Sequence, residues 1–238
     1  MAIGPAAVAA QAIESATQVS PEFTGDAPSS GILGMGMSKG NTVRPVQQKT
    51  FLENIAPTLL APLFTANLKH TVPGNYNFGF INPLEYTGPI QYMPIDINSI
   101  YWMFTPLGYQ VGQGTYTVAP WKSMVDTGTT LLLLPDTIVA AYYKQVRGAS
   151  FDRYWGGILF PCLSALPDFA FGYGTYRGVV PGRYINYGHI NATTCYGGIQ
   201  GSVGIGFSIF GDMILKAQFV VFDLGNKRIG WARKALLT

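Results

Sequence analysis

The stretch SMVDTGTTLLLLP, residues 123–135, places one aspartate between a short apolar run and a Gly-Thr-Thr turn that leads directly into four leucines. Short apolar runs on both sides of a turn predict a strand, a tight loop and a second strand. Gly128 permits a crowded or left-handed loop, and the hydroxyls of Thr129 and Thr130 can hydrogen-bond a carboxylate. Asp126 is therefore either an ordinary turn residue or one half of a catalytic pair of carboxylates.

The composition around this motif is typical of a turn-rich, mainly β protein. Of the 238 residues only 11% are charged, and the chain has 29 glycines and 16 prolines. From residue 62 onward, short apolar runs are separated by Gly, Pro and Asn turns. The net charge of +3 is scattered along the chain with no basic run, so nucleic-acid binding is not expected. No run of 18 apolar residues occurs, so no membrane-spanning helix is expected either.

One predicted helix precedes the β-type runs, and a second interrupts them. VQQKTFLENIAPTLL, residues 46–60, has the apolar spacing of an amphipathic helix. PDTIVAAYYKQV, residues 135–146, begins with Pro135 and Asp136, which suit the first turn of a helix. The first 18 residues, MAIGPAAVAAQAIESATQ, lack a basic segment and have mostly small apolar residues, so they do not predict a signal peptide.

The two cysteines, Cys162 and Cys195, leave two interpretations open. They are either free buried thiols or one disulfide that closes a long loop and contributes about 3 to 4 kcal/mol. The sequon Asn191-Ala192-Thr193 lies close to Cys195. It predicts glycosylation of Asn191 and leans towards a secreted origin.

Other segments accompany the D-T-G motif, and together they resemble one family. IFGD, residues 209–212, places two apolar residues and a glycine before an acid, and residues 219–232 predict a closing hairpin. The chain is similar to pepsin-like aspartic endopeptidases of the fungal secreted type over the rear part of their amino-terminal lobe and their whole carboxyl-terminal lobe. The similarity also includes ILGMGM (32–37), QQKTF (47–51), PLFTANL (62–68) and CYGGIQ (195–200).

The resemblance implies a mainly β fold with one complete lobe of bent sheets, residues 65–238, and an incomplete amino-terminal lobe, residues 1–64. It implies that the cysteines form the disulfide of the complete lobe. It also implies that the Ile-Phe-Gly segment, residues 209–211, packs against the D-T-G loop.

The resemblance also implies roles for single residues. Asp126 corresponds to the catalytic aspartate of the carboxyl-terminal half. Gly128 and Thr129 correspond to residues that orient this carboxylate and line the substrate cleft. Tyr143 falls where fungal relatives place an aromatic residue facing the primed subsites, and the alternative is a packing or surface tyrosine.

In this family the reaction needs two carboxylates that share one proton, each in its own D-T-G loop. D-T-G occurs once in these 238 residues, and the tyrosine-bearing flap hairpin is not recognisable. A peptidase would therefore need a second D-T-G from an identical chain in a homodimer or from an amino-terminal lobe. His70, His189 and Asp96 lie in no catalytic motif and are expected in solvated or packing roles.

Three functions remain open at this stage: an aspartic endopeptidase that acts on peptides, an inactive peptide-binding remnant, and a small-molecule acid/base catalyst in a biosynthetic pathway that uses Asp126. No metal-ligand cluster or phosphate loop is recognised, so no cofactor is expected. The resemblance implies secretion, whereas a chain that is complete as written would be cytoplasmic.

Overall fold

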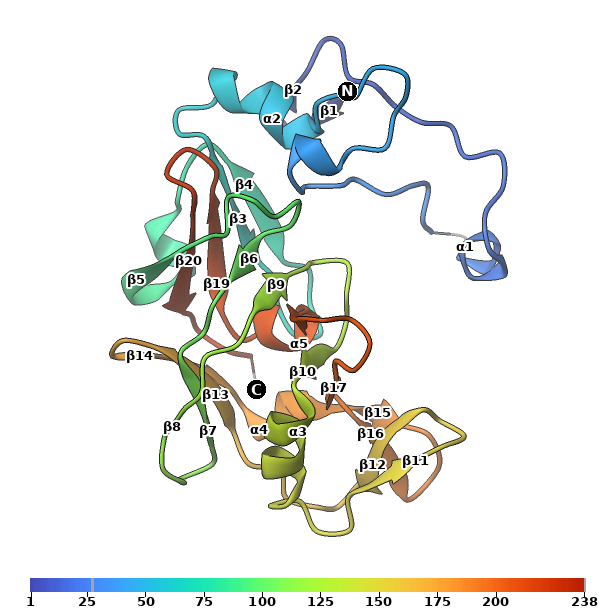
Figure 1. The fold of residues 1–238 in the computed structure, drawn as a ribbon, viewed down its shortest axis with the longest axis vertical. Helices are drawn as coiled ribbons and strands as arrows, with labels where there is room; N and C mark the ends of the chain where they lie inside the picture. The colour runs from blue at the N-terminus through green and yellow to red at the C-terminus, as the bar shows by residue number, and fades with distance from the viewer. Residues whose placement is uncertain (27, 238) are drawn as a thin grey trace.

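The computed structural model describes residues 1–26 and 28–237. Most of the regular structure within these residues is β, in four sheets of four or five strands and a small ribbon near the N-terminus (Figure 1). The predicted mainly β fold is confirmed. Among the described residues, no helix combines the length and the apolar character needed to cross a membrane.

A five-stranded antiparallel sheet joins segments from distant parts of the chain in the order β4-β3-β19-β20-β5. Every residue of its neighbouring strands β3 and β19 is buried, because other elements cover both faces. The buried Asp223 side chain is paired with the Arg228 guanidinium at 2.7 Å. The strands are β3 (Leu63–Asn67), β4 (Asn75–Phe78), β5 (Thr87–Pro94), β19 (Phe219–Asp223) and β20 (Arg228–Arg233).

A second five-stranded sheet, in the order β17-β10-β18-β9-β6, carries the D-T-G loop between β9 and β10. These two strands are not neighbours, because β18 lies between them, parallel to β9 and antiparallel to β10. The loop that holds Asp126 therefore passes over the end of β18. The strands are β6 (Met103–Phe104), β9 (Ser123–Val125), β10 (Leu132–Leu134), β17 (Ile199–Gly201) and β18 (Ser208–Phe210).

Two four-stranded sheets and three helices complete this part of the molecule. One sheet has the order β14-β13-β7-β8 and the other β11-β12-β16-β15. The strands are β7 (Gly108–Val111), β8 (Thr117–Val118), β11 (Ser150–Asp152), β12 (Gly157–Pro161), β13 (Phe169–Tyr173), β14 (Tyr176–Val180), β15 (Asn186–His189) and β16 (Thr194–Gly197), and the helices are α3 (Asp136–Tyr143), α4 (Gly182–Ile185) and α5 (Asp212–Leu215). Helix α3 confirms the helix predicted over 135–146 but is shorter: Pro135 precedes it, Asp136 lies in its first turn, and it ends at Tyr143.

Aromatic side chains from three of these sheets meet in one core. The ring centroid of Trp231 lies 4.9 Å from that of Phe171, 5.4 Å from that of Phe104 and 5.9 Å from that of Phe210. These residues come from β20, β13, β6 and β18. Each buried aromatic side chain contributes about 2 to 3 kcal/mol through the apolar surface it removes from water, so this cluster ties the sheets together below the D-T-G loop.

The cysteines form the disulfide that the resemblance implied. Cys162 and Cys195 are bonded, with their Cα atoms 5.0 Å apart. The bond joins the residue after β12 to a residue inside β16. The alternative of two free thiols is excluded by this structure.

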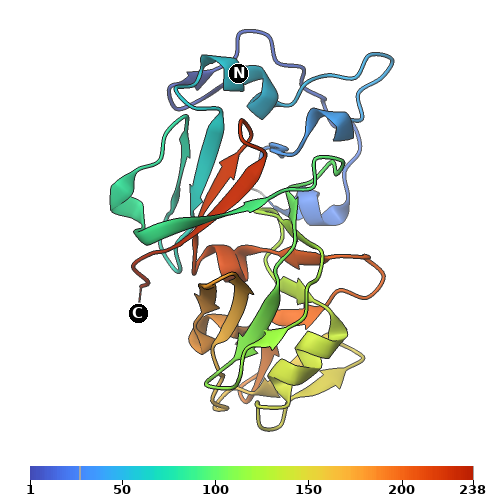
Figure 2. The ribbon, with the colours of Figure 1, turned by 60° about the vertical axis from the view of Figure 1, so that its left-hand side comes forward.

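The first fifty residues form long loops at one end of the molecule (Figure 2). Ala6 is the buried residue among those described there, and burial resumes at Phe51 and Leu52. The helix predicted over 46–60 is shorter, because Val46 is 67% exposed and faces no core. The elements within these residues are β1 (Ala2–Ile3), β2 (Ala6–Ala7), α1 (Pro21–Gly25) and a 3-10 helix at Ser38–Gly40. They are followed by α2 (Phe51–Ile55) and by 3-10 helices at Ala56–Thr58 and Pro83–Glu85.

Candidate active site at the Asp126 loop

The backbone of β18 and the residues after it fixes the shape of the D-T-G loop. The Asp126 N–H donates to the Phe210 carbonyl at 3.2 Å, and the Asp212 N–H donates to the Thr129 carbonyl at 2.8 Å. A Cβ atom on Gly211 would lie 2.2 Å from the Thr129 carbonyl oxygen and 2.4 Å from that of Leu131. Only glycine fits at this point, where the end of β18 touches the backbone of the D-T-G loop. The Ile-Phe-Gly segment therefore packs against the loop, as predicted.

The carboxylate of Asp126 is held at both oxygens. The Gly128 N–H donates to Oδ1 at 2.9 Å, and the Thr129 hydroxyl donates to Oδ2 at 2.6 Å. Hydrogen bonds to an ionised carboxylate are roughly twice as strong as neutral ones, so the half-buried side chain is fixed in one orientation. A glycine at position 128 lets the Asp126 carboxylate lie close to the backbone, because a Cβ atom there would be 3.2 Å from Asp126 Oδ1. Gly128 does not adopt a left-handed conformation, since its φ is not positive.

A second acid, Asp212, belongs to the same site and was not predicted. Burial raises the pKa of Asp212; the Lys216 ammonium, 3.8 Å from Oδ2, opposes this shift, and the negative charge of Asp126 adds to it. Its Oδ1 atom is buried without a hydrogen-bond partner among the described residues. The sequence signal for Asp212 was the IFGD motif, in which this acid directly follows Gly211, the glycine that packs against the D-T-G loop.

Tyr76 brings the five-stranded sheet of β3 and β19 to the same loop. It lies on the edge strand β4, and its side chain is 44% exposed. Burial raises the pKa of Tyr76, the nearby side chain of Thr127 opposes the shift, and the charge of Asp212 adds to it. Sequence reasoning had no signal for Tyr76, because its place beside the loop depends on how two sheets pack.

Tyr143 is buried on helix α3, with 7% of its surface exposed. Its hydroxyl donates to the Ile199 carbonyl at 2.8 Å, and its ring packs edge-on against Tyr142. Burial raises the pKa of Tyr143. The structure therefore shows Tyr143 joining α3 to β17, while its role in substrate binding stays a prediction.

The remaining residues singled out from the sequence lie in other surroundings. The His70 ring stacks on Tyr184 with centroids 4.5 Å apart, and exposed Asp96 accepts a hydrogen bond from the Asn98 N–H. Asn191 is exposed, and its Oδ1 atom accepts hydrogen bonds from the backbone of Thr193 and the residue after it. Glycosylation of Asn191 stays a prediction.

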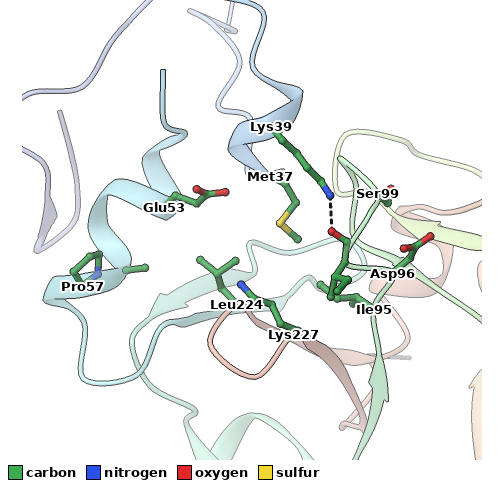
Figure 3. A pocket seen from close by; sticks show the side chains of 11 residues that line it. Met37, Lys39, Glu53, Pro57, Ile95, Asp96, Ser99, Leu224 and Lys227 are labelled. Carbon is green, nitrogen blue, oxygen red and sulfur yellow. Dashed lines mark hydrogen bonds between the residues drawn. The ribbon is translucent and has the colours of Figure 1, made fainter. Parts of the chain in front are cut away.

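A hollow of about 400 Å³ lies between helix α2, the end of β5 and the β19–β20 turn (Figure 3). Its lining shares no residue with the Asp126 loop. Two positive and two negative side chains line it, and the Lys39 ammonium is already bonded to the Ile97 carbonyl at 2.5 Å. These charged side chains are Lys39, Lys227, Glu53 and Asp96. The hollow therefore adds nothing to the chemistry of the carboxylates.

Known proteins share both this sequence and this fold. Residues 1–234 match the family model of eukaryotic aspartyl proteases. Penicillopepsin-1 of Talaromyces stipitatus is 47% identical over 98% of this chain, and endothiapepsin of Cryphonectria parasitica is 48% identical over 98%. These alignments cover 60% and 57% of the two relatives, so the chain spans about 60% of their length. The crystal structure of an aspartic proteinase from Irpex lacteus matches with a TM-score of 0.74 and 25% identity, over 87% of this chain and 69% of that one.

Proposed function

Because the chain belongs to the eukaryotic aspartyl protease family, we propose that it supplies the Asp126 half of an aspartic endopeptidase site. A second D-T-G aspartate, from outside these 238 residues, completes the pair. The observation that carries the proposal is the Asp126 carboxylate, held at both oxygens by Gly128 and Thr129 on the crossing of β9, β10 and β18.

The chemistry follows from placing two carboxylates side by side. Like charges at close range cannot both ionise, so the pair shares one proton. The ionised carboxylate takes a proton from a water molecule, whose oxygen attacks the peptide carbonyl carbon, while the protonated carboxyl donates to the carbonyl oxygen. Collapse of the tetrahedral intermediate returns a proton to the amine and breaks the C–N bond. The fixed orientation of Asp126 suits it to this exchange with a partner acid.

The proposal extends to the organisation of the chain. Residues 1–64 correspond to the rear part of an amino-terminal lobe and residues 65–238 to a carboxyl-terminal lobe. The sparse burial before Phe51 supports an incomplete amino-terminal part. Gly128, Thr129 and Tyr143 are proposed to line a cleft that takes an extended peptide. The Cys162–Cys195 disulfide supports a secreted protein, since such bonds persist in oxidising compartments.

The test is cleavage of a hydrophobic peptide between about pH 3 and 5, with and without pepstatin, over a range of chain concentrations. The chain is assayed alone and together with a separately expressed amino-terminal lobe that carries a D-T-G loop. We expect pepstatin-sensitive cleavage with the added lobe, and no cleavage by Asp126→Asn. Asp96→Asn, which alters an exposed acid outside the loop, is the matched control and should cleave like the unaltered chain.

The concentration dependence identifies the source of the second aspartate. A rate that rises with the square of the chain concentration indicates a homodimer. A rate that requires the added lobe indicates complementation. Cleavage that survives Asp126→Asn, or no cleavage under any of these conditions, overturns the proposal.

A further inference from the structure

A second cluster of reactive side chains lies around the disulfide. His189 is paired with Cys195 across strands β15 and β16, and the His189 Nδ1 atom lies 3.2 Å from the Cys162 sulfur. The two sulfurs and an imidazole nitrogen of His189 all lie within 4.8 Å of one another. Sequence analysis recognised no metal-ligand cluster here, because the sheet register, and not a short motif, brings the three residues together.

Backbone hydrogen bonds hold the three residues independently of the sulfur–sulfur bond. β12 pairs with β16 through Phe160 and Cys195, and β16 pairs with β15 through Cys195 and His189. The Cys162 N–H donates to the Thr193 carbonyl at 2.9 Å. Opening the disulfide therefore leaves two thiols and an imidazole on a sheet that still positions them.

Two thiolates and one imidazole are a ligand set for Zn²⁺ and similar cations. With metal–sulfur distances of about 2.3 Å and metal–nitrogen distances of about 2.1 Å, tetrahedral ligands lie about 3.5 to 3.8 Å apart. The present separation of 3.2 Å between His189 Nδ1 and the Cys162 sulfur is close to this spacing.

We propose that Cys162, Cys195 and His189 form a binding site for a thiophilic divalent cation of the Zn²⁺ type when the disulfide is reduced. A dithiol reductant supplies two electrons and two protons and leaves as its own disulfide, which converts the cysteines to thiols. The cation then displaces both thiol protons into solvent and binds two thiolates and the neutral imidazole. In the oxidised chain Nδ1 also lies 3.3 Å from the Asn191 carbonyl oxygen, which accepts its proton. As the metal ligand Nδ1 gives up this hydrogen bond, and the imidazole proton resides on Nε2.

The burial of the three residues leaves one side of the site open. Cys195 is fully buried, Cys162 is half-buried and His189 is exposed. Water can therefore occupy the fourth coordination position. Cys162 and Cys195 are 33 positions apart in the sequence. Under oxidising conditions the disulfide joins them, and under reducing conditions a bound metal ion joins them.

The test uses Co²⁺ as the probe, because its visible bands report tetrahedral coordination and its near-ultraviolet bands report thiolate ligands. The chain is reduced with dithiothreitol, freed of reductant under anaerobic conditions and titrated with Co²⁺. We expect one Co²⁺ per reduced chain, displacement by Zn²⁺, and no such bands for the oxidised chain. His189→Ala should weaken binding by about 100-fold, as a lost ligand would, whereas His70→Ala is the matched control and should bind normally.

Far-UV circular dichroism shows whether the reduced chain keeps its sheets. If reduction unfolds the chain, Zn²⁺ should restore the native spectrum, because binding to a folded site is coupled to folding. The proposal is overturned if the reduced, folded chain gives no thiolate–Co²⁺ bands. It is also overturned if His189→Ala binds Co²⁺ as tightly as the unaltered chain, or if Zn²⁺ fails to refold an unfolded reduced chain.

Discussion

The segments Ile32-Leu33-Gly34 and Ile209-Phe210-Gly211 have nearly the same local sequence and opposite structures. Ile32 is 81% exposed in a segment without regular structure, and a Cβ atom on Gly34 would meet nothing within 4 Å. Phe210 is fully buried in β18, and a Cβ atom on Gly211 would collide with two carbonyl oxygens. The pattern of two apolar residues and a glycine becomes a strand only where flanking strands accept its hydrogen bonds.

The same contrast separates the first fifty residues from the sheets that follow. The early segments have apolar residues such as Ile13 and Val19 that remain exposed, at 75% and 51%. From β3 onward, the strands bury apolar residues such as Phe64 and Val220, which are at most 2% exposed. Apolar content alone therefore does not create a core, because each apolar face needs a second layer to cover it.

Substituting the two glycines tests this contrast most strongly. Gly211→Ala should lower the free energy of unfolding by about 3 kcal/mol or more, because its methyl group meets backbone atoms that cannot move aside. Gly34→Ala is the matched control and should change it by less than about 0.5 kcal/mol. Urea unfolding followed by circular dichroism measures both. Equal effects at the two positions would remove the physical basis of the comparison.

Removing the disulfide tests how far the sheet region depends on its covalent link. Cys162→Ala/Cys195→Ala should lower the free energy of unfolding by about 3 to 4 kcal/mol, the chain-entropy cost of freeing a loop of this length. The measurement is urea unfolding with a chelator present. The unaltered chain with dithiothreitol should show the same loss, and the double variant should not respond to the reductant. A loss below about 1 kcal/mol would show that the strand ladders alone hold this loop.

Lys234 tests the cost of a charge inside the packed region. Its ammonium donates to the carbonyls of Leu68 and Leu215 in a buried position. Burial lowers the pKa of Lys234 to about 7; the charge of Lys69 adds to this shift and that of Glu85 opposes it.

The unfolded chain, with an ordinary lysine pKa of about 10.4, binds one more proton than the folded chain between about pH 7 and 10. The free energy of unfolding should therefore rise with pH across this window, by up to about 4 kcal/mol. Lys234→Met should flatten this rise in urea unfolding measured at several pH values. Lys39→Met, which removes an exposed ammonium in the loop region, is the control. An unchanged slope in Lys234→Met would contradict the prediction.

The smallest effect is expected at Asp212. Its pKa is raised in the folded chain, chiefly by burial, so above the ordinary aspartate pKa of about 4 the folded chain binds more protons than the unfolded one until its own raised pKa is passed. The free energy of unfolding should fall as pH rises through this interval, and Asp212→Asn should remove that part of the fall. Thermal unfolding at several pH values measures it, with the exposed Glu14→Gln as control. Parallel curves for Asp212→Asn and the unaltered chain would refute the assignment.

Local patterns predicted the parts of the structure that depend on neighbours in sequence. The strands around Asp126 and the start of α3 follow from apolar runs, a turn and a proline, and the structure has them at these places. The helix predicted over 46–60 was too long, because spacing does not reveal whether a core covers it. Tyr76 and Asp212 were missed as partners of the loop, since their approach depends on the register of sheets that join distant segments.

The position of β18 between β9 and β10 also has a consequence for biosynthesis. Residues up to Leu134 complete both strands that flank Asp126, but the strand that separates them begins at Ser208. Pairings between segments this far apart form slowly, because the chain between them must be ordered first. A ribosome-bound chain that ends before Gly211 therefore has its D-T-G loop without the backbone that shapes it. The loop that carries Asp126 is therefore held in place only after synthesis has passed Asp212.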